Sequence, residues 1–315
     1  MLASWPTRDW HAQRGSEPGE MARMLSLLAV LADKDLASGL IAKLIDQRGH
    51  DKSDNEAILE TAGLYPLDRA ADLLRRILMA HAVEALGACS ALLAGAVRAR
   101  FATKPGKLIG SLEALIDALP GDPSLAPKDQ YGRPISSNPE AGFVVDLVGV
   151  VDVVAPDLAK RAAQHILAWP GHFGLDNILV PAMLRLVETG GATAGDAFGL
   201  LHAAGLAHLK RRAAEPLEAP KDWLRVSGVR CTCAHCTALV RFLGDAGSAT
   251  WSLKAAQPIR SHVETTIANA RCDLDTRTER RGTPHSLVCT KNQASYERRV
   301  AQRKQDLADI KTLSR

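Results

Sequence analysis

Residues 67–78 read Leu-Asp-Arg-Ala-Ala-Asp-Leu-Leu-Arg-Arg-Ile-Leu, and this stretch decides the fold class. Its apolar side chains recur three and four residues apart, at Leu67, Ala70, Ala71, Leu74, Ile77 and Leu78. On a helix of 3.6 residues per turn these positions form one stripe, and the charged residues between them lie on the opposite face. The stretch therefore predicts an amphipathic helix that buries one side.

Helical patterns continue on both sides of this stretch. Ser53 and Glu56 have the spacing of a capping box, which predicts that a helix starts at Ser53. Further helices are expected near Phe143 and Leu158 and over 178–186 and 194–212. The chain is 46% hydrophobic but only 4% aromatic, a composition that favours helices over sheets. We expect a mainly α protein built as an irregular, α-solenoid-like helical array, with a non-repetitive bundle as the alternative because no strict repeat period is found.

Breaks in the helical pattern predict the domain organisation. Five prolines and two glycines between Leu119 and Glu140 forbid regular structure there. A second break, Glu215-Pro-Leu-Glu-Ala-Pro220, precedes a region of different character. The predicted organisation is an irregular leader (1–18), a first helical half (19–119), a Pro-rich loop (120–140), a second helical half (141–214) and a cysteine-rich module (221–315).

Two apolar runs bear on membrane association. Met21 to Ala32 resembles the apolar part of a signal peptide, but its side chains also recur at helical spacing and fit an amphipathic helix. Ala85 to Val97 is too short for the ~20 residues that span a bilayer, so we expect a buried helix. Clustered thiols in a chain of this length are typical of a reducing compartment. We therefore expect a soluble, cytoplasmic protein without a membrane partner.

The last 95 residues differ from the helical region in charge and in pattern. Residues 221–315 contain 17 Lys and Arg against 9 Asp and Glu. A helix is expected after a cysteine-rich turn within 231–244, a second over 258–270 and a charged helix over 293–313. Residues 272–279 and 286–290 flank Arg281-Gly-Thr-Pro284, which predicts a β-hairpin. This region is predicted to be a small, basic, cysteine-rich α+β module.

Three of the six cysteines lie in Cys231-Thr-Cys-Ala-His-Cys236. Cys233 and Cys236 have the spacing of a zinc knuckle, in which a tight turn directs two thiolates to one metal at about 2.3 Å, and Cys231 lies two residues earlier. The best candidates for a fourth ligand are His262 and, alternatively, Cys272, whereas His235 is disfavoured because it lies inside the turn. Reduced thiols without a metal, or a redox or iron–sulfur role, remain alternatives. Cys89 and Cys289 are expected to be core residues.

Basic and hydroxyl side chains around the predicted hairpin indicate a second candidate site. Arg260, Thr278, Arg280 and Lys291 are candidates for binding an anion such as phosphate. A solvated basic hairpin edge explains the same residues equally well. Nucleic acid or another polyanion is thus a possible partner through 260–304, although few aromatic side chains are available there to stack on bases.

Motifs of common enzyme classes are missing from the sequence. We find no GxSxG nucleophile elbow, HExxH helix, GxxxxGK[ST] loop or GxGxxG loop. The histidines at 81, 165, 202 and 208 stand singly in predicted helices and are expected to be structural rather than metal ligands.

The C-terminal motifs resemble a known region. The pattern comprises Cys231-x-Cys233-x-x-Cys236, Arg260-x-His262, Thr278, Gly282-Thr-Pro284-His-Ser-Leu287 and Thr290-Lys291. It resembles, over about residues 225–315, a region found downstream of prolyl-hydroxylase-like 2-oxoglutarate/Fe(II) oxygenase domains in multidomain proteins. The resemblance implies an accessory module, because those oxygenase domains are β jelly rolls that hold iron through an HxD/E pair and a distant histidine. His262-Val-Glu264 matches HxE formally but lies in a predicted helix.

These observations lead to two functional hypotheses. The first is a non-catalytic helical scaffold that binds a protein partner and carries a C-terminal module organised by a structural metal, predicted to be zinc. The second is an enzyme or accessory subunit linked to a 2-oxoglutarate/Fe(II) oxygenase, in which the cysteine cluster and the Arg, His and Lys residues form a site.

Overall fold

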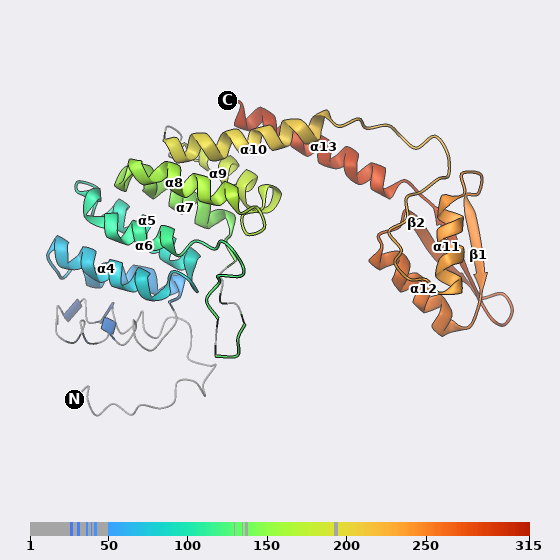
Figure 1. Ribbon diagram of the computed structural model, residues 1–315, viewed down its shortest axis with the longest axis horizontal. Helices are drawn as coiled ribbons and strands as arrows, with labels where there is room; N and C mark the ends of the chain where they lie inside the picture. The colour runs from blue at the N-terminus through green and yellow to red at the C-terminus, as the bar shows by residue number, and fades with distance from the viewer. Residues whose placement is uncertain are drawn as a thin grey trace. The chain divides into compact units, whose positions relative to one another are not determined.

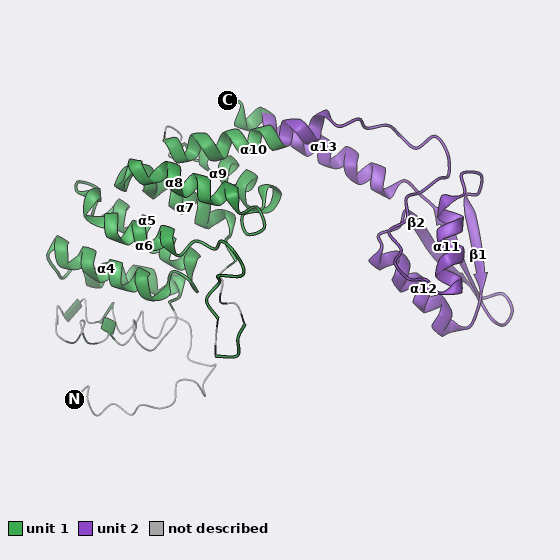
Figure 2. Cartoon of the chain, in the orientation of Figure 1, with its two compact units in different colours: residues 1–208, 311–315 green, residues 209–310 purple. Residues whose placement is uncertain are grey.

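The computed structural model describes residues 50–315 except 129, 134, 136, 137 and 192–194, together with the isolated positions 26, 27, 30, 31, 36, 39, 41 and 42. The predicted leader (1–18) lies outside the described residues, as does most of the apolar run that starts at Met21. Figure 2 shows that the chain divides into two compact units. Residues 209–310 form the C-terminal unit, and the chain before residue 209 forms the helical unit together with residues 311–315.

The helical unit confirms the predicted class of structure (Figure 1). Its described elements are η3 (Lys52–Asp54), α3 (Asn55–Ala62), α4 (Leu67–His81), α5 (Leu86–Ala99), η4 (Pro105–Leu108), α6 (Ile109–Asp117), α7 (Ala141–Val154), α8 (Pro156–Ala168), the π-helical turn η5 (Leu175–Leu179), α9 (Val180–Glu188) and the start of α10 (Asp196–Ala214). Residues 67–78 form the start of α4, and their apolar stripe is buried from Ala70 to Leu78.

The helices pack against elements that lie two places along the chain. α3 contacts α5, α5 contacts α7 and α7 contacts α9, while α4 contacts α6. α5 and α7 are apolar on most of their surface and bury residues on several sides, as expected for helices inside such an array. The predicted buried helix over 85–97 is therefore confirmed as α5. Cys89 on α5 is fully buried, and burial raises the pKa of its thiol to about 12, so its role is packing.

The start of α3 differs from the sequence prediction. Ser53 was expected to cap a helix with Glu56, but Asp51, two residues earlier, performs the capping. The Asp51 carboxylate accepts hydrogen bonds from the Ser53 amide at 2.8 Å and from the Ser53 hydroxyl at 2.6 Å. Ser53 thus lies inside the short helix η3 that leads into α3, because Asp51 caps the start of η3 two residues upstream.

The Pro-rich segment 120–140 has no helix among its described residues, as predicted. Two histidines attach its first residues to the helical unit. His165 Nε2 lies 3.0 Å from the carbonyl oxygen of Pro120, and His172 Nε2 lies 2.9 Å from that of Gly121. His208 similarly contacts Asp176 Oδ1 at 2.9 Å, so these histidines act as structural hydrogen-bonding groups.

The C-terminal unit contains a small antiparallel sheet and confirms the predicted α+β module (Figure 1). Its elements are α11 (Ala234–Gly244), β1 (Thr250–Lys254), α12 (Gln257–Asn269), β2 (Leu274–Glu279), β3 (Ser286–Lys291) and most of α13 (Ala294–Leu313), with α10 contributing its last residues. The predicted hairpin is formed by β2 and β3, with Thr278 paired to Leu287. The sequence analysis missed β1, which pairs with the other edge of β3 and gives the order β1-β3-β2.

One face of this sheet is buried beneath α11 and α12. Leu287 and Cys289 alternate with outward residues along β3 and pack with Leu239, Leu243 and Val263. Burial raises the pKa of the Cys289 thiol to about 12, which confirms the expectation that Cys289 is a core residue. This single cluster is small, so other interactions must contribute to holding the unit together.

A buried carboxylate links the two long helices inside the C-terminal unit. Asp306 on α13 is 1% exposed and accepts hydrogen bonds from Arg212 Nε at 2.8 Å and from a terminal nitrogen of the same guanidinium at 2.6 Å. Gln302, one turn earlier on α13, donates to the same carboxylate at 2.9 Å. This bidentate arrangement fixes α13 against the end of α10.

In the part of the chain that the structure covers, every helix is too short or too polar to cross a bilayer.

Candidate metal centre

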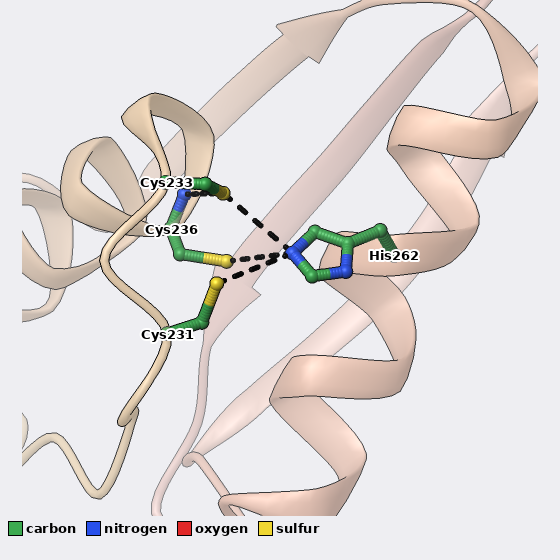
Figure 3. A group of neighbouring side chains, drawn as sticks. All are labelled: Cys231, Cys233, Cys236 and His262. Carbon is green, nitrogen blue, oxygen red and sulfur yellow. Dashed lines mark hydrogen bonds between the residues drawn. The ribbon is translucent and has the colours of Figure 1, made fainter.

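Three thiols and one imidazole converge in the C-terminal unit. Figure 3 shows Cys231, Cys233 and Cys236 directed at Nε2 of His262. The sulfur-to-nitrogen distances are 3.5 Å for Cys231, 3.6 Å for Cys233 and 3.4 Å for Cys236. The four donor atoms all lie within 4.8 Å of one another, so the group could hold a metal ion.

The three distances match the edges of a coordination tetrahedron. Zinc binds thiolate sulfur at about 2.3 Å and imidazole nitrogen at about 2.0–2.1 Å. In a regular tetrahedron with those radii a sulfur and a nitrogen are separated by roughly 3.6 Å. The observed sulfur-to-nitrogen distances of 3.4–3.6 Å are therefore those expected if one ion lies at the centre of the group.

The start of α11 positions two of the thiols. Cys233 is the N-cap residue of this helix, and its sulfur accepts a hydrogen bond from the Cys236 amide at 3.5 Å. Cys236 lies three residues further, inside the first turn, so both sulfurs face the same side. The partial positive charge of the helix N-terminus favours thiolate over thiol at the cap. A Cys-x-x-Cys spacing at a helix start therefore produces a preformed pair of soft ligands.

The segment before α11 delivers the third thiol. Gly228 lies against the end of α12, where an added Cβ would be 3.3 Å from the Ala270 carbonyl oxygen, so a larger residue would push the segment away. Val229 packs on the hydrophobic cluster beside it. Arg225 fixes the other end of this segment, because its guanidinium donates to the Asn292 carbonyl oxygen at 2.7 Å and to that of Asp222 at 2.8 Å. Arg225 is 5% exposed, a structural role that the sequence analysis missed.

His262 belongs to α12, as its predicted helix requires. The hydroxyl of Thr266, one turn along α12, donates to the His262 carbonyl oxygen at 2.8 Å and lies 3.7 Å from the Cys236 sulfur. Thr266 thus contacts two of the four candidate ligands, in the way that neighbouring groups orient metal ligands. Glu264 does not join His262 in the candidate group, and neither does His235.

Cys272, the alternative fourth ligand, lies elsewhere. α12 ends with the chain reversing at Arg271, whose φ is +47°, and the Cys272 amide donates to the Ile267 carbonyl oxygen at 3.1 Å. This hydrogen-bonding pattern closes the helix and leads the chain into β2. The Cys272 side chain consequently packs against the hydrophobic cluster rather than beside the other thiols.

The thiols differ in acidity when no metal is bound. The hydrogen bond from the Cys236 amide, followed by contacts with the Cys236, His262 and Cys231 side chains, lowers the pKa of Cys233 to about 6. Burial raises the pKa of Cys236 to about 11. Cys233 therefore carries its negative charge at neutral pH, whereas Cys236 keeps its proton until a cation displaces it.

This difference predicts an order of alkylation. In metal-loaded protein, iodoacetamide should leave Cys233 unmodified although it is exposed, because its sulfur is bound to the ion. After chelation Cys233 should react first at pH 7 and Cys236 last, and the Cys233 rate should fall roughly tenfold at pH 5 as its thiolate is protonated. Peptide mass spectrometry at successive times measures the order. Equal alkylation rates for Cys233 and Cys236 would contradict the difference in acidity between the two thiols.

The four candidate anion ligands do not form one site. Arg260 is buried and donates to the Ala255 carbonyl oxygen at 3.1 Å and to the Thr278 hydroxyl at 3.2 Å. Lys291 is 3% exposed, donates to the Asp245 carbonyl oxygen at 2.6 Å and lies 4.4 Å from the centre of the Phe242 ring. Thr278 pairs with Leu287, which lies four residues before Lys291 on β3. Four residues of strand separate the backbones of Leu287 and Lys291 by about 13 Å. Arg260 and Lys291 are thus structural, while Arg280 is exposed.

No family model, curated protein or solved structure matches the chain. The resemblance to the oxygenase-associated region stays a prediction.

Proposed function

We propose that this chain is a non-catalytic binding protein whose C-terminal unit is held together by a structural zinc ion. The observation that carries the proposal is the set of three sulfurs at 3.4–3.6 Å from His262 Nε2. Four protein ligands complete a tetrahedron and leave no position for substrate or water, whereas catalytic zinc sites retain an open position. A complete set of protein ligands supports a structural role over the enzyme hypothesis.

The donor types support zinc as the metal. Thiolate ligands select soft and borderline ions, and Cys₃His is an established ligand set for structural zinc. Hard cations such as magnesium and calcium prefer carboxylate and carbonyl oxygens, which the candidate group lacks. The site would connect the segment before α11 to α12 across the 31 residues that separate Cys231 from His262.

Elemental analysis of protein purified without added metal tests this proposal. We expect about one zinc ion per chain, and loss of that ion from the Cys231→Ser/Cys236→Ser double variant. Cys272→Ser is the matched control, because it removes a thiol of the same unit that packs in the core, and it should retain the zinc. A native protein without metal, or equal zinc loss from the control variant, would contradict the proposed ligand set.

For the helical unit we propose a protein partner. Stacked helices present an extended surface to which other proteins can bind. Several large apolar side chains on these helices reach solvent, among them Met79 on α4 (63% exposed) and Val153 on α7 (47% exposed). A pull-down with and without nuclease tests the partner class, because loss of all partners after nuclease treatment would overturn a protein partner.

A further inference from the structure

The basic residues of the C-terminal unit fall into two groups that the sequence did not distinguish. Arg225, Arg260 and Lys291 are buried and donate to backbone carbonyl oxygens inside the unit. Lys254, Arg280 and Arg281 are exposed. Within the described chain no ion pair or side-chain hydrogen bond engages these three residues. Their charges are therefore available to a ligand.

Strand register places the exposed group at one end of the sheet. Lys254 is the last residue of β1 and pairs with Ser286, and Ser286 pairs on its other side with Glu279, the last residue of β2. Arg280 and Arg281 follow directly in the turn between β2 and β3. Two strand spacings separate the backbones of Lys254 and Glu279, which is about 10 Å. We call Lys254, Arg280 and Arg281 the basic tip.

Little at this end of the sheet opposes an anion. The two segments that form it, 253–260 and 278–287, contain a single carboxylate, that of Glu279. Arg277 on β2 already donates to this carboxylate at 2.7 Å. His285 adds an imidazole in the turn, where its Nδ1 lies 2.9 Å from the Gly282 carbonyl oxygen. The local charge is therefore positive even with His285 neutral.

The chemistry of the basic tip favours one class of partner. The segments that form it expose no large apolar side chain, so they offer nothing to insert into a membrane. Apart from the imidazole of His285, they contain no aromatic side chain on which a base could stack. Two guanidinium groups and an ammonium spread over about 10 Å instead match several phosphates in a row, since a strand of duplex DNA carries one charge per about 3.4 Å.

We propose that the basic tip binds the phosphate backbone of nucleic acid without reading its base sequence. The proposal rests on the zinc-held fold of the C-terminal unit, which keeps β1 and the β2–β3 turn side by side. Binding through three phosphates gives an affinity that falls as salt rises, with a slope of about 2 on logarithmic axes for a single strand and nearly 3 for a duplex.

The test measures binding of the zinc-loaded full chain to short labelled oligonucleotides by fluorescence anisotropy at several salt concentrations. Mixed-sequence RNA, single-stranded DNA and duplex DNA serve as probes. The Arg280→Glu/Arg281→Glu variant should bind at least about tenfold more weakly at low salt, and its salt slope should be smaller by about 1.4–1.8. Changing the base sequence at constant length should alter the affinity little.

Arg241→Glu/Lys304→Glu is the matched control. It makes the same charge change at two exposed residues on α11 and α13. We expect it to bind nearly as well as the native protein. If both variants bind oligonucleotides equally weakly, the basic tip is not the binding site, and net positive charge alone explains the attraction.

Two further measurements separate this proposal from the zinc proposal. Zinc content and hydrogen exchange of β3 show whether the unit of each variant is intact. If an intact, zinc-loaded protein binds no oligonucleotide at low salt, nucleic-acid binding is overturned and the zinc proposal survives. The same conclusion follows if the protein binds phosphatidylserine vesicles in a salt-dependent way but binds no oligonucleotide. If native protein contains no zinc but still requires Arg280 and Arg281 for oligonucleotide binding, the result would support binding by the basic tip and contradict the zinc proposal.

Discussion

Removal of the metal by a chelator should make the backbone amides of β1, β2 and β3 exchange with solvent at least about a hundredfold faster. That factor corresponds to a loss of about 3 kcal/mol in the free energy of opening. The reason is the small size of the buried cluster, which alone supports only a marginally stable fold. Structural zinc contributes its binding free energy directly to folding. Hydrogen exchange followed by mass spectrometry measures the effect.

The helical unit provides the internal control for this experiment. Its core lies in α5 and α7 and uses none of the four candidate ligands, so the exchange of these helices should stay the same. Adding zinc back should restore slow exchange in the sheet. Slow exchange in the sheet after complete loss of the ion would show that the unit does not depend on a metal.

Asp306→Ala should lower the free energy of unfolding of the C-terminal unit by about 3 kcal/mol. Breaking a buried ion pair by removing one partner costs about 3–5 kcal/mol. We expect the lower end of this range, because the Arg212 side chain is 26% exposed and keeps some contact with water after the change. The variant should also lose the Gln302 contact. The exchange of α13 amides measures the loss.

Asp309→Ala is the control for this variant. Asp309 lies on the same helix and accepts one hydrogen bond from Gln305 at 2.8 Å in an exposed position. Its removal should change stability by less than about 0.5 kcal/mol. A similar loss in both variants would mean that helix α13 is sensitive to any lost carboxylate rather than to the buried pair.

The fourth ligand shows what the sequence could and could not predict. Cys231, Cys233 and Cys236 stand close together along the chain, so their spacing alone indicated a shared site. His262 was the predicted fourth ligand, and Cys272 was the alternative. The choice between them depends on the reversal at Arg271, where a residue other than glycine adopts a positive φ. Such a conformation is uncommon for arginine, and the sequence carries no signal for it.

The basic residues illustrate a second limit. Arg260 and Lys291 were expected on an anion-binding surface, yet both are buried and satisfied by backbone carbonyl groups. A long cationic side chain can bury its stem and still find a partner, so residue type alone does not reveal its environment. β1 was missed although Trp251 and Leu253 alternate with polar residues, because five residues are a short signal.

Helices were easier to predict than their packing. The stripe from Leu67 to Leu78 depends only on local spacing and reappears in α4. The contacts of α3 with α5 and of α5 with α7 join residues that are distant along the chain, and the sequence has no repeat period from which these contacts could be predicted. Asp51 took the capping role expected of Ser53 for a similarly local reason, since its carboxylate accepts a hydrogen bond from the amide of Ser53 two residues further on.

Residues 311–315 group with the helical unit, although residues 209–310 form a unit of their own. In terms of chain connectivity, the cysteine-rich unit is an insertion into the helical unit and not a tail attached to its end. Cutting the chain near residue 214 would therefore remove the last piece of the helical unit along with the inserted one. A shortened protein meant to isolate the helical unit should instead join residue 208 to residue 311 through a flexible linker.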